Sequence, residues 1–509
     1  HGNSKEDIQD LLNDLQSMSK IPLLVAANCD SGGNGACSEG TYIASGAQAE
    51  AAGDLQVSYH AGLVSAREEK ALGVNVNFDP CVDILYNWRN TIVNTRAYGT
   101  DAETVIKYTN AYLDGLTAEN GENMEDGVIQ CIKHFPGDGT EERDQHLVLG
   151  VNELSPEEWR ASFGKVYQNH IDRGVEMIMA GHIAVPALQK ELNSALEDKD
   201  IMPATLAEEL IQDALKTELG FNGLVITDAT HMLGMTSAMR REDYVPKSIA
   251  AGCDMFLFFN NIAEDFGFML KGYQNGVITE ERLTDALRRI LGLKAKLHLP
   301  EKQANGTLLR TREDLNVIGC EEHLQWRAEA ADKGISLIKD TQNNLPINPV
   351  DHKRIRLYML EGEKGGITDN GSKAQQLFVD ELTKRGYEVT VNERGSRVKG
   401  ATLKYRDEVD FALEVADIAG YGAQNNYRIQ WSTAMANEVP WFVWEVPHAF
   451  VSLNFTTHLH DATMVKTFVN AYHNNEETIK QVIDKLEGKS EFKGGHNDLV
   501  WTDKWQAKL

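Results

Sequence analysis

A short segment of the chain, residues 132–146, concentrates titratable side chains around a break in the backbone pattern. It reads Ile-Lys-His-Phe-Pro-Gly-Asp-Gly-Thr-Glu-Glu-Arg-Asp-Gln-His. The apolar run Gly127–Ile132 is typical of a buried strand, and the proline and glycines that follow force a loop. Asp144 and His146 are two residues apart, so the carboxylate can bond one imidazole nitrogen and fix the tautomer of the ring. Such a pair can transfer protons in catalysis. The simpler alternative is a surface loop whose charges are only solvated.

A second candidate is Asp228, which directly follows the run Leu-Val-Ile-Thr. A carboxylate at the end of a buried strand is energetically costly unless it has partners or a task. In α/β barrels, the loops at the C-terminal ends of the strands carry the chemistry. Asp228 is therefore expected to belong to the same site as the Asp144–His146 pair.

The order Lys-His-Phe-Pro-Gly-x-Gly, four residues, then Asp-x-His resembles the signature of the family 3 glycoside hydrolases, in their branch of bacterial β-N-acetylhexosaminidases. The resemblance implies that Asp144 and His146 are the general acid/base dyad. The run Gly-Leu-Val-Ile-Thr-Asp is similar to the nucleophile strand of that family, which implies that Asp228 attacks the sugar. It also implies that Lys133 and His134 contact sugar hydroxyls.

Three further residues are expected to bind the sugar. The family has Asp-x-Glu-Gly-Gly at a strand end where this chain has Asn28, Cys, Asp30, Ser and two glycines, and we expect Asp30 to hold the hydroxyls. The alternative there is a tight glycine-rich turn. Asn-Thr-Arg-Ala-Tyr-Gly-Thr-Asp is similar to the family's Arg-Ser-Phe-Gly-x-Asp segment, so Arg96 is expected to grip the sugar with its guanidinium fork. His182 ends another strand-like run and either lines the pocket or bonds the backbone.

The resemblance implies a retaining, exo-acting glycoside hydrolase. It would release a β-linked N-acetylhexosamine, with N-acetylglucosamine as the first choice, from an oligosaccharide or glycoconjugate through a covalent glycosyl-aspartate. An alternative is a phosphorylase that uses phosphate as acceptor, because a neutral imidazole does not repel a phosphate dianion as a carboxylate does. A catalytically inactive sugar-binding protein is an alternative of another class.

No cofactor and no metal are expected. The six cysteines form no Cys-x-x-Cys pair and no zinc-like cluster with histidine. Buried free thiols are the expected state, with a Cys29–Cys37 disulfide as the alternative.

Composition narrows the partners of the protein. The formal charge is 50 − 76 = −26, which disfavours nucleic acid and anionic membranes. The sequence has no run of 18 apolar residues, so no membrane span is expected. A cytoplasmic location is expected, with secretion left open because no initiator Met or signal peptide is visible. The oligomeric state is left open.

An α/β fold must position these side chains. We predict a TIM-type (β/α)8-like barrel over residues 1–300, a linker over 301–333 and a smaller α/β sandwich domain over 334–509. Capping boxes predict helix starts at Ser155 and Thr205. Six strand-like runs fall in the barrel, at residues 22–27, 74–84, 127–132, 176–185, 223–227 and 254–259. Four fall in the second domain, at residues 355–360, 388–391, 441–444 and 449–453.

Overall fold

A computed structural model describes residues 3–362, 372–419 and 427–509 of the chain. These residues form two compact units. The first extends up to residue 46 and includes residues 58–324, and the second contains residues 47–57 and 325–509. The stretch 301–333 is helical over much of its length, because it includes most of α12 (Leu299–Asn305) and α13 (Glu321–Gly334).

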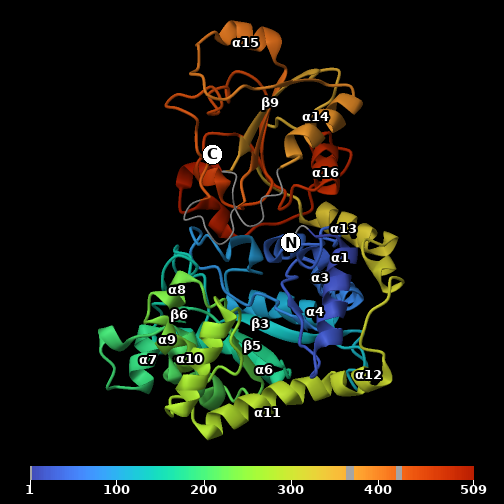
Figure 1. Ribbon diagram of the computed structural model, residues 1–509. Coiled ribbons are helices and arrows are strands. Elements are labelled where there is room, and N and C mark those ends of the chain that lie inside the picture. The colour runs from blue at the N-terminus through green and yellow to red at the C-terminus, as the bar shows by residue number, and fades with distance from the viewer. Residues whose placement is uncertain (1–2, 363–371, 420–426) are drawn as a thin grey trace. The chain divides into compact units, whose positions relative to one another are not determined.

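A five-stranded parallel sheet organises the first unit (Figure 1). The strand order is β1-β2-β3-β5-β7, so each new strand is added on the same side of the sheet. Met255 continues this edge with a parallel bridge to Ile226 in β7. The strand bounds are β1 Ala26–Ala27, β2 Val76–Asn77, β3 Ile129–Phe135, β5 Met177–Ala180 and β7 Leu224–Thr227, and a separate pair is formed by β4 Gly150–Val151 and β6 Ile183–Ala184.

Helices surround this sheet, as expected for parallel strands joined by crossover connections. Several begin at a side-chain cap: Ser155 forms the predicted capping box, and Asp101, Asn261 and Thr279 each accept a backbone N–H bond. The helices of this unit are α1 Lys5–Met18, α3 Leu55–Leu72, α4 Ala102–Thr117, α5 Pro156–Trp159, α6 Lys165–Asp172, α7 Pro186–Leu192, α8 Leu233–Thr236, α9 Arg241–Ala250, α10 Ile262–Gln274 and α11 Glu280–Lys296. Helix α2 (Gly46–Ala52) belongs, apart from its first residue, to the second unit.

The core of the first unit lies against this sheet. β5 and β7 are buried along their whole length. Strands covered on both faces are apolar throughout rather than alternating. Val76, Ile129, Met177 and Leu224 from four strands pack with Leu293 from α11 in one apolar cluster. The strand ends, and the residues that follow them, are therefore held by a packed core.

A six-stranded sheet forms the centre of the second unit. Its order is β10-β9-β11-β12-β13-β8, with β8 antiparallel to its neighbour and the other pairs parallel. Helices α14 (Ala374–Lys384) and α16 (Glu476–Leu486) pack on one face of the sheet, and α15 (Thr402–Glu408) precedes β11. The strands are β8 Ser336–Asp340, β9 Arg354–Glu361, β10 Glu388–Val391, β11 Phe411–Asp417, β12 His448–Ser452 and β13 Thr467–Asn470.

The predicted α/β class, a barrel-like unit followed by a smaller α/β sandwich, is confirmed, although the described parallel sheet has five strands and a bridge instead of eight strands. Two strand predictions are wrong. Residues 256–259 make no ladder beyond Met255, and residues 441–445 form turns. Phe442 instead stacks on Tyr358 with ring centroids 4.9 Å apart, so that apolar run is buried as a turn rather than as a strand.

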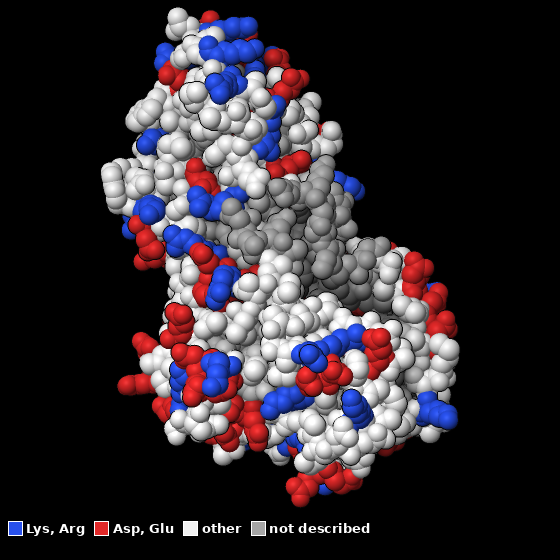
Figure 2. Space-filling view, turned by 60° about the vertical axis from the view of Figure 1, so that its left-hand side comes forward, with Lys and Arg blue, Asp and Glu red and all other residues white. Residues whose placement is uncertain are grey.

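The surface carries both signs of charge. On the face in Figure 2, acidic and basic side chains lie beside one another rather than in patches of one sign. All six cysteines are free and five are buried, as predicted. Among the helices that the structure describes, none has both the length and the apolar character needed to cross a bilayer.

Candidate active site

The candidate residues gather at one edge of the first unit's sheet. Each lies at the C-terminal end of a parallel strand or in the loop that follows it, which is the catalytic end of an α/β barrel. Asp30 follows β1, Lys133 and His134 end β3, the Asp144–His146 pair lies in the next loop, His182 follows β5 and Asp228 follows β7. Arg96, in a short turn of 3₁₀ helix after β2, reaches Asp30 with its guanidinium group.

Asp144 and His146 form the dyad that their spacing predicts. The Nδ1 atom of His146 lies 2.7 Å from Oδ1 of Asp144, and the backbone amide of His146 donates to the same oxygen at 2.8 Å. The Asp144 side chain is fully buried, while that of His146 is 25% exposed. The Asp144 side chain therefore orients the imidazole through Nδ1, which leaves Nε2 as the nitrogen for proton exchange with a substrate. The alternative of a solvated surface loop is wrong for Asp144.

Asp228, which the sequence predicts as the nucleophile, lies directly after β7 and has a lowered pKa. Its amide donates to the carbonyl of Ala180 at 2.8 Å, and its Oδ1 accepts the amide of Ala229 at 2.7 Å. Burial raises the pKa of Asp228, but His134, His182 and the Ala229 amide together hold that pKa below its ordinary value. Burial lowers the pKa of the neighbouring His182.

The dyad loop and the loop after β7 are joined. The amide of Leu233 donates to the carbonyl of His146 at 3.0 Å, and His146 is among the groups that lower the pKa of Asp228. Gln145, which lies between Asp144 and His146 in the sequence, is buried, and its Oε1 accepts a hydrogen bond from the His182 amide at 2.7 Å. These bonds fix the loop that carries the imidazole to the strand ends beside Asp228.

A buried network positions Lys133. Its ammonium lies 2.7 Å from Oδ1 of Asp79 and donates to Oδ1 of Asn28 at 2.9 Å. Burial raises the pKa of Asp79 to about 7, although the Lys133 ammonium lowers it. Next to this pair, Nε of Arg96 contacts Oδ2 of Asp30 at 2.9 Å. Burial raises the pKa of Asp30, but Arg96 and Lys133 hold it below its ordinary value.

At two positions, 28 and 30, this chain differs from the family's Asp-x-Glu-Gly-Gly segment, and the two side chains have different partners. Asn28 contacts Lys133, whereas Asp30 contacts Arg96. The Asp30 side chain is 27% exposed, so an oxygen of a bound sugar can reach it. Asn28 is more exposed than Asp30, so exposure does not decide between them, and Asp30 as the sugar-binding acid stays a prediction.

His134 belongs to a second Asp–His pair. Its Nδ1 lies 2.7 Å from Oδ2 of Asp83, whose Oδ1 accepts the amide of Asp138 at 2.7 Å. The thiol of Cys81 donates to Oδ2 of Asp83 at 3.1 Å. Asp83 thus orients the imidazole in the way that Asp144 orients His146.

The atoms of Cys81, Asp83 and His134 lie close enough to hold a metal ion, and they are the only such group among the described residues. Their chemistry does not fit one. Burial and the Asp83 carboxylate raise the pKa of the Cys81 thiol well above its ordinary value, so the thiol stays protonated. Both Asp83 oxygens already accept hydrogen bonds, which a metal would have to displace.

We therefore expect chelation to leave the activity unchanged. Dialysis against EDTA, followed by assay of kcat/KM with an aryl glycoside, should give the value of the untreated enzyme. Activity that is lost in chelator and restored by one divalent ion would show that this cluster holds a functional metal.

The structure favours a positioning role for His182. Its Nε2 lies 2.9 Å from the carbonyl of Ala229, and its Nδ1 lies 2.9 Å from Oγ1 of Thr205. The side chain is fully buried and both ring nitrogens have protein partners. The capping box predicted at Thr205 is wrong: this residue lies inside a short 3₁₀ turn, and its hydroxyl is used by the histidine.

Sequence reasoning missed Asp79, Asp83, Asp138 and Gln145. Asp79 directly follows the buried segment Val74–Phe78, but two asparagines interrupt the apolar residues there, so Asp79 lacks the sequence signal of Asp228. The other three are identified by their partners in the folded chain. Burial and the adjacent Asp83 carboxylate raise the pKa of Asp138, and its Oδ1 accepts Nδ2 of Asn90 at 2.9 Å.

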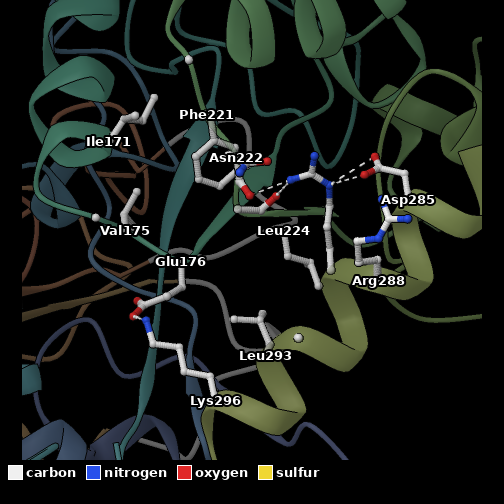
Figure 3. Close-up of a pocket in the computed structure, with 15 residues that line it drawn as sticks. Ile171, Val175, Glu176, Phe221, Asn222, Leu224, Asp285, Arg288, Leu293 and Lys296 are labelled. Carbon is white, nitrogen blue, oxygen red and sulfur yellow. Dashed lines mark hydrogen bonds and ion pairs between the residues drawn. The ribbon is translucent and has the colours of Figure 1, made fainter. Parts of the chain in front are cut away.

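A cavity of about 680 Å³ lies at the other end of the strands (Figure 3). Glu176 and Phe221, which line it, precede β5 and β7, and α11 forms its other wall. Its charged groups are largely paired, as Glu176 is with Lys296 and Asp285 with Arg289. This end of an α/β barrel generally serves stability. The cavity is therefore separate from the candidate site.

Comparison with known proteins places this geometry in a family. The sequence profile described as "Glycosyl hydrolase family 3 N terminal domain" matches residues 3–293. The chain belongs to glycosyl hydrolase family 3. It is 39% identical over 500 residues to a β-N-acetylglucosaminidase/β-glucosidase of Cellulomonas fimi, covering 97% of this chain and 86% of that protein. The family resemblance read from residues 132–146 is thereby confirmed.

Solved structures agree with this assignment. One described as the β-glucoside phosphorylase BglX is 37% identical, with a TM-score of 0.93 over 100% of this chain and 90% of that one. A family 3 β-N-acetylglucosaminidase from Paenibacillus sp. str. FPU-7 is 21% identical with a TM-score of 0.75, which shows the shared fold. The protein is accordingly a family 3 glycosidase.

Within this site, Lys133→Ala tests sugar binding. The ammonium is rigidly held, as a group that grips a substrate should be. We expect kcat/KM to fall by roughly one to three powers of ten, or about 1.4–4 kcal/mol of transition-state binding. Because the change also leaves Asp79 without its partner, assays should be run well below the measured Tm. Lys199→Ala, on an exposed lysine, is the control, and a Lys133→Ala enzyme equal to it would restrict Lys133 to a structural role.

Proposed function

We propose that the protein is a retaining exo-glycosidase that releases a terminal β-linked N-acetylhexosamine, with N-acetylglucosamine as its sugar. The observation that carries this proposal is that Asp228, with its lowered pKa, and the Asp144–His146 dyad lie at the same edge of the sheet. The Cellulomonas fimi relative is described as both a β-N-acetylglucosaminidase and a β-glucosidase, which supports a gluco-configured sugar.

The first step joins the sugar to the enzyme. A carboxylate oxygen of Asp228 forms a bond to the anomeric carbon while the bond from that carbon to the aglycone oxygen breaks. The aglycone oxygen takes the proton of Nε2 of His146, and the Asp144 carboxylate stabilises the imidazole that carries it. Lys133, His134, Arg96 and Asp30 are proposed to bind the hydroxyls and the acetamido group of the sugar.

The second step releases the sugar. His146, now deprotonated at Nε2, removes a proton from water while the water oxygen bonds to the anomeric carbon. The bond to Asp228 breaks and its carboxylate is restored. Two displacements at one carbon preserve its configuration, so the first product seen by NMR should be the β-anomer.

Phosphate is a second candidate acceptor. The observation that favours it is the close structural similarity to a protein described as a β-glucoside phosphorylase. A neutral His146 would let a phosphate dianion approach, whereas a carboxylate base would repel it. The covalent first step is the same in both cases.

One product assay decides between the acceptors. A nitrophenyl β-N-acetylglucosaminide is incubated in phosphate buffer and in a buffer without phosphate. Free sugar in both buffers supports hydrolysis, and sugar 1-phosphate in the first establishes phosphorolysis. The glucoside and the galacto-configured N-acetylhexosaminide, run in parallel, test the choice at C2 and C4. Sugar binding by calorimetry with no turnover on any of them would reject both proposals in favour of an inactive sugar-binding protein.

A further inference from the structure

One helix of the first unit carries apolar side chains on a face that the described chain does not cover. Helix α10 packs beside α9 (Figure 1). Its inner side contributes Phe268 and Met269 to an apolar cluster with Leu206, Tyr244 and Val245. Its outer side and the adjoining segments carry seven large apolar residues that are 39% to 68% exposed. This set, called here the α10 face, consists of Phe258, Phe259, Ile262, Phe266, Leu270, Tyr273 and Val277.

The exposed side chains of the helix form one stripe. At 3.6 residues per turn, Ile262, Phe266, Leu270 and Tyr273 fall within an arc of about 80°. An ordinary surface helix buries its single apolar side and turns its polar side to water. The apolar arc of α10 continues from its buried side, at Phe268 and Met269, into the exposed stripe, while Glu264 and Lys271 lie on the remaining side. Part of the apolar arc is therefore left facing solvent, which is the pattern of a contact surface.

The size of the α10 face matches a protein interface. The exposed fractions correspond to on the order of 800 Å², since a large apolar or aromatic side chain offers roughly 150–250 Å². The largest apolar patch on a typical monomer is roughly 300–600 Å², whereas each partner in a standard interface buries about 800 Å². The patch is thus of the size that one partner needs.

We propose that the α10 face is the interface of a homodimer, in which two copies pack α10 against α10 about a two-fold axis. The exposed apolar area is that of one side of a standard interface. In a two-fold dimer the same patch is used by both copies, so a second copy presents an apolar stripe of the same length. Antiparallel helices also place the positive end of each helix dipole beside the negative end of the other. A chain of formal charge −26 repels its own copies, so apolar contact has to supply the attraction between them.

The charge balance sets an expected salt response. Screening weakens the general repulsion between two acidic chains and leaves apolar contact intact. The dimer should therefore strengthen as NaCl is raised. An interface held by ion pairs would show the opposite dependence.

Sedimentation analysis of the full chain tests the proposal. We expect the wild type to be dimeric, with a Kd that is roughly micromolar or lower for an interface of this size. Leu270→Asp places a charge in the centre of the stripe and should shift the protein to monomer. Leu11→Asp is the matched control, because Leu11 is also an exposed helical leucine, at 52% against 44% for Leu270, but lies on α1. It should leave the dimer unchanged.

Two outcomes overturn the proposal. One is a wild-type protein that stays monomeric at concentrations well above micromolar and in high salt. The other is a dimer that Leu270→Asp leaves intact, which would locate the interface on another surface. Circular dichroism and Tm of both variants show that the fold is kept, which is expected because each side chain is exposed.

Discussion

Replacing Asp228 by alanine should reduce kcat/KM by roughly four to six powers of ten, or about 5–8 kcal/mol of transition-state stabilisation. The variant lacks the carboxylate oxygen that bonds to the anomeric carbon. No other candidate residue lies at the end of β7, where it could take the place of that oxygen. The fold should persist, because within the described residues the carboxylate accepts one hydrogen bond, from the Ala229 amide, and the loss of that bond is local. Asp198→Ala removes a 95% exposed carboxylate and should keep wild-type activity.

Azide sharpens this test. In Asp228→Ala, azide can enter the space that the carboxylate leaves and attack the same face of the anomeric carbon. A single displacement then yields the α-glycosyl azide from a β-glycoside with a good leaving group. NMR of the product identifies the anomer. Wild-type rates in Asp228→Ala, or no α-azide at any concentration, would remove Asp228 from the role of nucleophile.

The pH dependence follows from the same carboxylate. Because the pKa of Asp228 is held below its ordinary value, the residue stays ionised down to acid pH. An ordinary aspartate titrates near about 3.9, so the limb of kcat/KM that reports this nucleophile should lie below about pH 4. Activity is then lost as the pH falls through that limb, since the protonated acid cannot attack. If activity instead falls as the pH is lowered from neutral, the acid limb reports another group, such as Asp79, whose pKa burial raises to about 7.

The sequence contains much of this site because strand ends can be recognised locally. Asp30, Lys133 and Asp228 each lie at or just after an apolar run, and the structure places all three at one sheet edge. Asp79 follows Val-Asn-Val-Asn-Phe, where asparagines alternate with apolar residues, so the same rule does not select it. Apolar runs that alternate with helical segments predict parallel strands, and parallel strands bring their C-terminal ends to one edge, as in the barrel-like unit.

Contacts between distant residues could not be read in this way. Gln145 acts through its bond to the amide of His182, which is 37 positions away in the chain. The hydroxyl of Thr205 matched a capping pattern, yet in the folded chain it serves the His182 ring. Local sequence shows which groups can bond, and tertiary structure selects among the possible partners.

Short apolar runs were the weakest part of the fold prediction. The run Trp441–Trp444 has the apolar composition of a buried strand but folds as turns, and Tyr405 packs against it with a ring centroid 4.8 Å from that of Trp441. Burial alone does not distinguish the two outcomes, because both remove the same apolar area from water. The run Glu388–Val391, in contrast, is β10 with the predicted bounds, and it pairs in parallel with β9.

Removing the imidazole of His146 should have an effect that depends on the leaving group. His146→Ala lacks the proton donor of the first step, so release of an alkyl or sugar aglycone should fall by roughly three to four powers of ten. The 2,4-dinitrophenolate ion needs no proton, and its glycoside should still react with Asp228 in a rapid burst. The second step should then become limiting, because water lacks its base. Stopped-flow detection of dinitrophenolate separates the two steps.

Azide provides the decisive measurement for this variant. It should accelerate the second step of His146→Ala by attacking the glycosyl ester of Asp228 without help from a base. The attack comes from the face opposite to the carboxylate, so the product is the β-glycosyl azide, the anomer opposite to that from Asp228→Ala. Asp144→Asn keeps the imidazole but removes the charge that holds its Nδ1 proton, and should show a weaker form of the same pattern. Equal slowing of all leaving groups with no azide product would assign the proton transfer to a residue other than His146.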